Sequence, residues 1–145
     1  TAQKLRHVDL LLEKPFAVTL GSAVGLPLEP PAEVLLANPV SFIAQKLLIH
    51  QRRDPGKRPN DVLYIHDAVV LFASHLDDLR DIWREDLRPF LPARTAMRVE
   101  RLARERFSQV DDVIRTAVRI PQDRVLRPER VRAACAAGLK EIFGN

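Results

Sequence analysis

The stretch that decides the fold is residues 38–72, NPVSFIAQKLLIHQRRDPGKRPNDVLYIHDAVVLF. It contains two apolar segments joined by a short charged turn. Asn38 is a typical N-cap residue and Pro39 is favoured at the first helical position, so the sequence predicts a helix over about residues 39–53. The Asp-Pro-Gly turn at residues 54–56 ends a helix. We therefore expect two helices in this stretch.

Charged residues lie in this hairpin at positions where packing alone does not require them. A projection at about 100° per residue places Lys46 inside the apolar arc of the first helix. The second helix is expected over about residues 58–75, with Asp61 on its apolar side and in its first turn, where the helix dipole favours a carboxylate. Helices joined by a short turn pack antiparallel, so the sequence predicts that Lys46 or Arg53 approaches Asp61.

Two interpretations fit this arrangement. In the structural one, the charges form a buried or half-buried salt bridge that ties the two helices together. In the functional one, they form a charged cluster that orders the mouth of a nucleotide or phosphate site, and Lys57 and Arg58 in the turn add positive charge. Asp67 lies away from the Asp61 stripe and is expected to cap or pair with later helices. The sequence leaves both interpretations open.

The segment before the hairpin is expected to form short strands. Residues 5–12 alternate and then become wholly apolar, as in a strand of a sheet interior. Asp9 interrupts that strand, which by packing alone indicates an edge position exposed to water. Further strands are expected at residues 16–20 and 33–37, separated by a loop rich in proline and glycine.

The rest of the chain is predicted to be helical. The expected helices cover about residues 77–91, 93–107 and 109–120, and a last one begins at residue 128. The predicted fold class is α+β and mostly helical, with short N-terminal strands followed by a bundle of about six helices. The predicted division is residues 1–37 and 38–145. Trp83 and Phe90 are the first place to look for docking of a partner chain.

Composition narrows the class of protein. The 145 residues are 46% hydrophobic and 29% charged, which is typical of one soluble globular domain. No run approaches the roughly 20 apolar residues of a membrane span. The single cysteine excludes an internal disulfide framework and favours a reducing, cytoplasmic setting. Because the chain does not begin with Met and is strand-like from residue 4, we expect a fragment whose partner strands lie upstream.

A basic helix face offers a second type of function. The net charge of +4 permits nucleic-acid binding without requiring it. Arg94, Arg98 and Arg101 share the outer face of their predicted helix, and Arg104 and Arg106 lie near them in the sequence. They are expected either to contact RNA or an acidic protein, or to form a solvated surface in which they pair with Glu100 and Glu105.

The two halves of the hairpin, PVSFIAQKLLIHQRR and KRPNDVLYIHDAVVLF, resemble the helical hairpin of bacterial nucleotidyltransferase-like proteins. These are members of the polymerase-beta-type superfamily related to the abortive-infection toxin AbiE. There, a Lys on the first helix, an Arg at its end and a Lys-Asp pair opening the next helix recur. The matching residues are Lys46, Arg53 and Asp61. Asn60 replaces the basic residue expected before Asp61, although Lys57 is close by.

The same resemblance extends to the N-terminal segment. In that superfamily, two carboxylates after a Gly-Ser turn and a third on a later strand bind divalent metal, here expected to be Mg²⁺, for phosphoryl transfer. RHVDLLLEKPF resembles the later strand, which makes Asp9 the candidate catalytic and metal-binding carboxylate. No Gly-Ser turn followed by Asp-x-Asp occurs in the sequence, and Gly21-Ser22 comes after Asp9. The resemblance therefore implies that residues 1–37 are the remnant of a nucleotidyltransferase sheet.

The resemblance implies a function for the parent protein. It would transfer a nucleotidyl group from a nucleoside triphosphate to an acceptor such as RNA or protein, with this chain inactive alone. Lys46, Arg53 and Lys57 would bind nucleotide or phosphate, and Asp61 and Asp67 would support them. The alternative is a helical module that binds nucleic acid or protein without catalysis.

Overall fold

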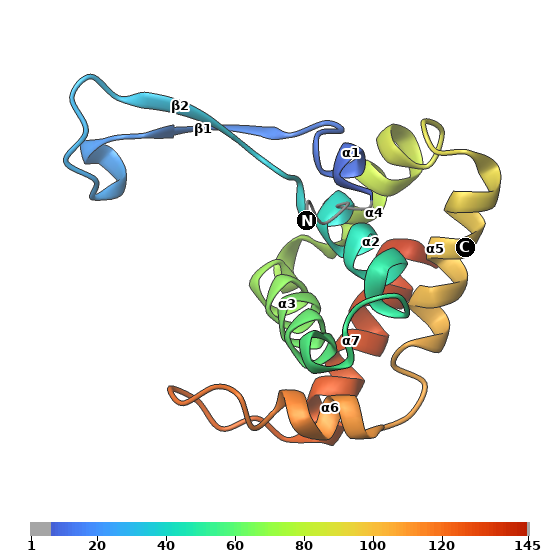
Figure 1. Cartoon of the computed structure of the whole chain (residues 1–145). Helices are drawn as coiled ribbons and strands as arrows, with labels where there is room; N and C mark the ends of the chain where they lie inside the picture. Colours follow the sequence, from blue (N-terminus) through green and yellow to red (C-terminus); the bar gives the residue numbers. More distant parts are fainter. Residues whose placement is uncertain (1–6, 145) are drawn as a thin grey trace, which may run out of the picture.

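The computed structural model describes residues 7–144. Helices form the body of the molecule, and a β-hairpin projects from one side of it (Figure 1). This architecture confirms the predicted fold class, α+β and mostly helical. No helix among the described residues is long and apolar enough to cross a membrane.

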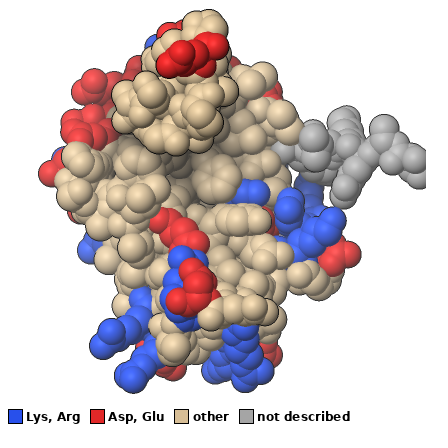
Figure 2. Space-filling view, turned by 90° about the vertical axis from the view of Figure 1, so that its left-hand side faces the viewer, with Lys and Arg blue, Asp and Glu red and all other residues tan. Residues whose placement is uncertain are grey.

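The projecting hairpin consists of β1 (Phe16–Leu20) and β2 (Ala32–Leu36), with the 3₁₀ turn η1 (Ser22–Val24) between them. The strands pair antiparallel, with Phe16 opposite Leu36 and Leu20 opposite Ala32. Both strands were predicted, the second within one residue of its observed bounds. Figure 2 looks at the molecule from the hairpin side and shows a hollow, largely uncharged surface beneath the hairpin.

The first predicted strand is wrong over the residues that the structure describes. Residues 5 and 6 lie outside them, and Val8–Leu11 form a short helix, α1. A short apolar run fits a strand and a buried helical turn equally well. The helical turn places Leu10 in the core, only 3% exposed, where α1 packs against α2. A strand here would need a neighbour, and the two described strands pair with each other.

The predicted helical hairpin is present as α2 (Pro39–His50), the 3₁₀ turn η2 (Pro55–Lys57) and α3 (Arg58–Leu71). Asn38 caps α2 as expected, because its side-chain oxygen accepts a hydrogen bond from the Ser41 N–H at 2.8 Å. The helix ends three residues before the predicted position. Arg58 holds the turn that follows by donating to the carbonyl oxygens of Gln51 and Arg53.

The remaining helices follow the prediction in order and differ at their ends. They are the 3₁₀ turn η3 (Ala73–His75), α4 (Leu76–Asp81), the π-helix η4 (Ile82–Leu87), α5 (Ala93–Glu105), α6 (Asp112–Ala117) and α7 (Pro128–Phe143). The helix predicted over 109–120 is shorter because Asp111 caps α6, accepting from the Ile114 N–H at 2.9 Å.

Helix α7 packs against α3, α4, α5 and α6 and completes the core. Gly138 permits the contact with α3, since a Cβ atom there would lie 2.4 Å from Cγ1 of Val69. Trp83 is buried, with its ring 5.0 Å from that of Phe143. Trp83 is thus part of the core, and the prediction that it offers a docking surface is wrong. Phe90 is exposed.

Candidate functional site

The predicted charge cluster exists at the inner surface of the helical hairpin. Asp61, in the first turn of α3, is fully buried. Lys46 Nζ from α2 lies 3.5 Å from its Oδ1 atom, and Arg53 Nε lies 3.1 Å from its Oδ2 atom. The sequence predicted that one of the two cations would approach Asp61. The antiparallel packing of α2 and α3 brings both Lys46 and Arg53 close to Asp61.

Two aromatic rings complete the surroundings of Lys46. Its Nζ atom lies 5.2 Å from the ring centre of Phe42 and 5.1 Å from that of Tyr64. These distances are within the range of cation–π attraction. The Lys46 side chain is only 12% exposed, so the carboxylate and the two rings replace most of the water around its ammonium group.

Burial and charge act in opposite directions on Asp61. Burial raises the pKa of the carboxyl group above its ordinary value, and the positive charges of Lys46 and Arg53 act against that shift. Removing either cation would leave the carboxylate buried with less compensation. Arg53 is the cluster member that reaches solvent, with 32% of its side chain exposed. It is therefore the member that an external anion meets first.

Lys57 and Asp67 do not touch this cluster. Lys57 is exposed and directly precedes α3. Asp67 accepts hydrogen bonds from Arg124, at 2.6 and 2.9 Å, and lies 3.1 Å from Nδ1 of His66. Asp67 was predicted to cap or pair with later helices, but its partner Arg124 lies in the loop between α6 and α7.

The structure does not bring Asp9 to the cluster. Asp9 is exposed on α1 and lines a separate pocket of about 220 Å³ with Glu13 and Thr95. None of Lys46, Arg53 and Asp61 lines that pocket. Within residues 7–144, no three His, Cys, Asp or Glu side chains lie close enough together to hold a metal ion.

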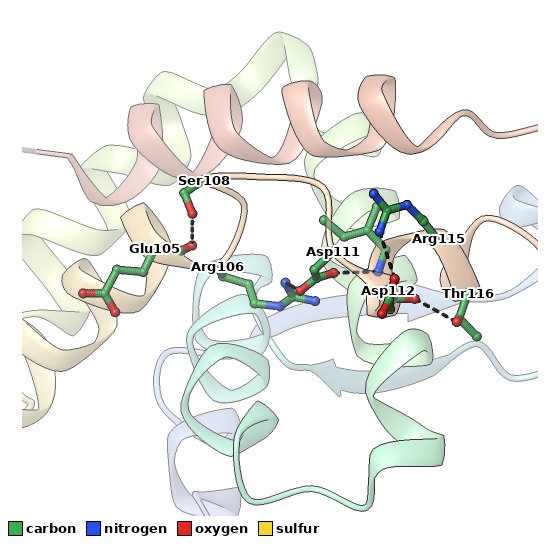
Figure 3. Close-up of polar contacts among 8 residues, drawn as sticks. Glu105, Arg106, Ser108, Asp111, Asp112, Arg115 and Thr116 are labelled. Carbon is green, nitrogen blue, oxygen red and sulfur yellow. Dashed lines mark hydrogen bonds and ion pairs between the residues drawn. The ribbon is translucent and has the colours of Figure 1, made fainter.

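A second polar site was missed by the sequence analysis. A pocket of about 350 Å³ lies where the end of α2, the end of α5 and the start of α6 meet. Arg106 lines it and donates to Asp111 at 2.9 Å (Figure 3). The sequence analysis grouped Arg106 loosely with the outer arginines, but its side chain is only 10% exposed. The signal available in the sequence was the neighbouring Phe107, a large apolar residue that is fully buried in the core and therefore indicates that this end of the helix lies close to the core.

His50 lines the same pocket and is held in its neutral form. Burial, together with the positive charges of Arg106 and Arg58, lowers the pKa of His50 from 6.5 to about 4, and the negative charge of Asp111 acts against that shift. Its Nδ1 atom is buried without a hydrogen-bond partner among the described residues. This histidine therefore makes folding sensitive to pH.

The fold and the cluster together define a mostly helical α+β protein with a carboxylate that holds two cations on a helical hairpin. A family model described as "Nucleotidyltransferase" matches residues 1–88, which include α1, the β-hairpin and both helices that carry the cluster. The chain belongs to this nucleotidyltransferase family. Comparisons with curated proteins and with solved structures gave no match.

Proposed function

We propose that this protein transfers a nucleotidyl group from a nucleoside triphosphate to an acceptor, RNA or protein, in the polymerase-beta-type manner and as a relative of the AbiE toxin. The observation that carries this proposal is the family match over residues 1–88, because it contains the whole α2–α3 hairpin with its charge cluster. The free, buried thiol of Cys135 supports a cytoplasmic location.

In this proposal, the hairpin supplies positive charge to the phosphates. Nucleotidyl transfer depends mainly on positioning and on electrostatic stabilisation of the phosphate oxygens. Asp61 holds Lys46 and Arg53 in place, and the partly exposed Arg53 contacts a phosphate. Lys57 adds charge from the exposed turn before α3. Asp67 and Arg124 support α3 from outside the cluster.

The carboxylates needed for transfer form the second part of the proposal. No Gly-Ser turn followed by Asp-x-Asp occurs in residues 1–145, and the described residues contain no cluster of three or more His, Cys, Asp or Glu side chains that could hold a metal ion. We propose that transfer needs carboxylates beyond those described, with Asp9 as a third one, and that this chain is inactive alone. The requirement for Mg²⁺ stays a prediction.

Label transfer tests the proposal. The protein expressed from its full open reading frame is incubated with total RNA and cell protein, and with nucleoside triphosphates labelled at either the α- or the γ-phosphate. We expect the α-label, and not the γ-label, to become attached to a macromolecule. Attachment of the γ-label would indicate phosphoryl transfer instead, and attachment of neither would refute the proposal.

A further inference from the structure

Six arginine side chains from three separate segments line one groove of about 890 Å³. One comes from the turn after α2, one from the turn after η4, and four from α5: Arg52, Arg88, Arg94, Arg98, Arg101 and Arg104. In Figure 1, α5 lies on the opposite side of the helical body from the projecting hairpin. We call this feature the arginine groove.

Most of this positive charge is not neutralised by the protein. Glu100, the one carboxylate in the lining, is buried and accepts a hydrogen bond from Arg88 at 2.8 Å. Arg101 lies 3.9 Å from Glu105, and both side chains are 56% exposed. The pairing with Glu100 and Glu105 that the sequence offered as the solvated-surface alternative therefore applies to Arg101 alone.

The other four arginines form no ion pair with any carboxylate between residues 7 and 144: Arg52, Arg94, Arg98 and Arg104. Like charges gathered on one surface repel one another, and an external anion removes that repulsion. Arginine is suited to this purpose because its planar guanidinium group binds phosphate through two parallel hydrogen bonds. The composition of the groove thus favours a phosphate-bearing ligand.

The shape of the arginine groove favours a chain of phosphates over a single one. Arg94 and Arg104 are ten residues apart, so the row on α5 extends for about 15 Å. Arg52 and Arg88 widen the row from two other segments. No aromatic side chain lines the groove, so bases have no ring on which to stack there.

We propose that the arginine groove binds the phosphate backbone of a nucleic-acid strand, with little dependence on base sequence. This binding goes beyond the proposed nucleotidyl transfer, and only the role of the strand as acceptor rests on that function. Arg52 of the groove is adjacent in sequence to Arg53 of the cluster. A nucleic-acid strand bound in the arginine groove therefore lies next to the α2–α3 helical hairpin, which carries the proposed phosphate contacts.

The test is binding of a fluorescein-labelled 20-nucleotide RNA, and of DNA of the same sequence, followed by anisotropy between 50 and 200 mM salt. Four unpaired arginines predict a slope of about −3 for log K against log salt, hence a loss of roughly 50-fold in affinity over this range. The variant Arg94→Gln/Arg98→Gln/Arg104→Gln should reduce the slope to about −1. RNA and DNA should bind alike if only phosphates are contacted.

The matched control is Arg119→Gln/Arg127→Gln/Arg130→Gln, which removes the same charge from exposed arginines outside the groove. It should keep the slope of the unmodified chain. Equal losses in both variants, a flat salt response, or tighter binding of an acidic peptide or of phosphatidylserine vesicles than of RNA would overturn the proposal. If the groove variant does not fold, Arg94→Gln/Arg104→Gln, both exposed, takes its place. The assay contains no nucleoside triphosphate, so its outcome is independent of the transfer assay.

Discussion

Asp61 is the residue on which the helical hairpin depends. It is fully buried and holds two cations from α2 and from the turn that follows it. The sequence predicted this contact because helical periodicity placed Asp61 and Lys46 on inward-facing surfaces. It did not predict the ring pair around Lys46, since which rings meet depends on how α2 and α3 pack.

Replacing Asp61 with Asn should destabilise the protein by about 3 kcal/mol, because Lys46 is left largely buried without an anion. Urea unfolding followed by circular dichroism measures the change. Asp67→Asn is the control, since it removes a carboxylate whose side chain is 42% exposed, and it should have far less effect. The double replacement Lys46→Met/Asp61→Leu should recover much of the loss. Equal stability of Asp61→Asn and the unmodified protein would show that the cluster does not hold the hairpin.

His50 should make stability fall in mildly acidic solution. Its pKa is lowered from 6.5 to about 4 in the folded protein, so the unfolded chain binds the proton first as the pH falls. The contribution to stability is complete above pH 6.5 and is lost as the pH falls towards 4. Between pH 7.5 and pH 5, the loss should be about 2 kcal/mol. In His50→Gln this part of the pH dependence should disappear, and an unchanged pH profile would contradict the assignment.

At the scale of elements, local signals predicted some helices and strands well and others poorly. The N-cap of α2, the prolines opening α3 and α7, and strand β1 were located correctly, because each has a cap, a proline or an alternating pattern of its own. Helix α1 was predicted as a strand because a short apolar run does not distinguish the two. The π-helix η4 has no local signal of this kind.

The Asn38 side chain links the segment that follows α1 to the start of α2. Replacing Asn38 therefore tests how the N-terminal segment is held. Its side-chain oxygen caps α2, and its side-chain N–H groups donate to the carbonyl oxygens of Glu13 and Lys14, each at 3.0 Å. Asn38→Ala should lose about 2–3 kcal/mol from the cap and these two bonds together. Asn38→Ser keeps a capping oxygen and should lose about half as much. Equal effects of Ala and Ser in thermal unfolding would show that the cap contributes little.

Replacing Gly138 with alanine tests the close contact between α3 and α7. In Gly138→Ala, the new methyl group would lie 2.4 Å from the side chain of Val69, which is buried and β-branched and so cannot turn away easily. We expect a loss of about 2 kcal/mol, although alanine favours helices. In a Val69→Ala background, the same replacement should be neutral or stabilising. A loss of the same size in that background would mean that the contact with Val69 is not the cause.

At the scale of the whole molecule, the sequence located the charge cluster but not its relation to the other charged sites. Asp9 and Asp61 belong to different sites, and Arg106 is buried where an outer position was expected. These facts follow from long-range packing of α5, α6 and α7, which periodicity does not encode. The arginine groove likewise depends on Arg52 and Arg88, which join the α5 row only in the folded chain. The family match places the hairpin in the nucleotidyltransferase family.

The central claim is that the α2–α3 hairpin both stabilises the fold and presents positive charge to a nucleotide. The most direct measurement is the affinity of the full-length protein for a non-hydrolysable nucleoside triphosphate, in the unmodified form and in Arg53→Gln. Arg119→Gln is the control, since it removes an exposed arginine outside the cluster. We predict that Arg53→Gln weakens binding about tenfold, as loss of one charge-assisted phosphate contact implies, and that Arg119→Gln leaves it unchanged. Unchanged affinity in a folded Arg53→Gln protein would contradict the claim and restrict the cluster to a structural role.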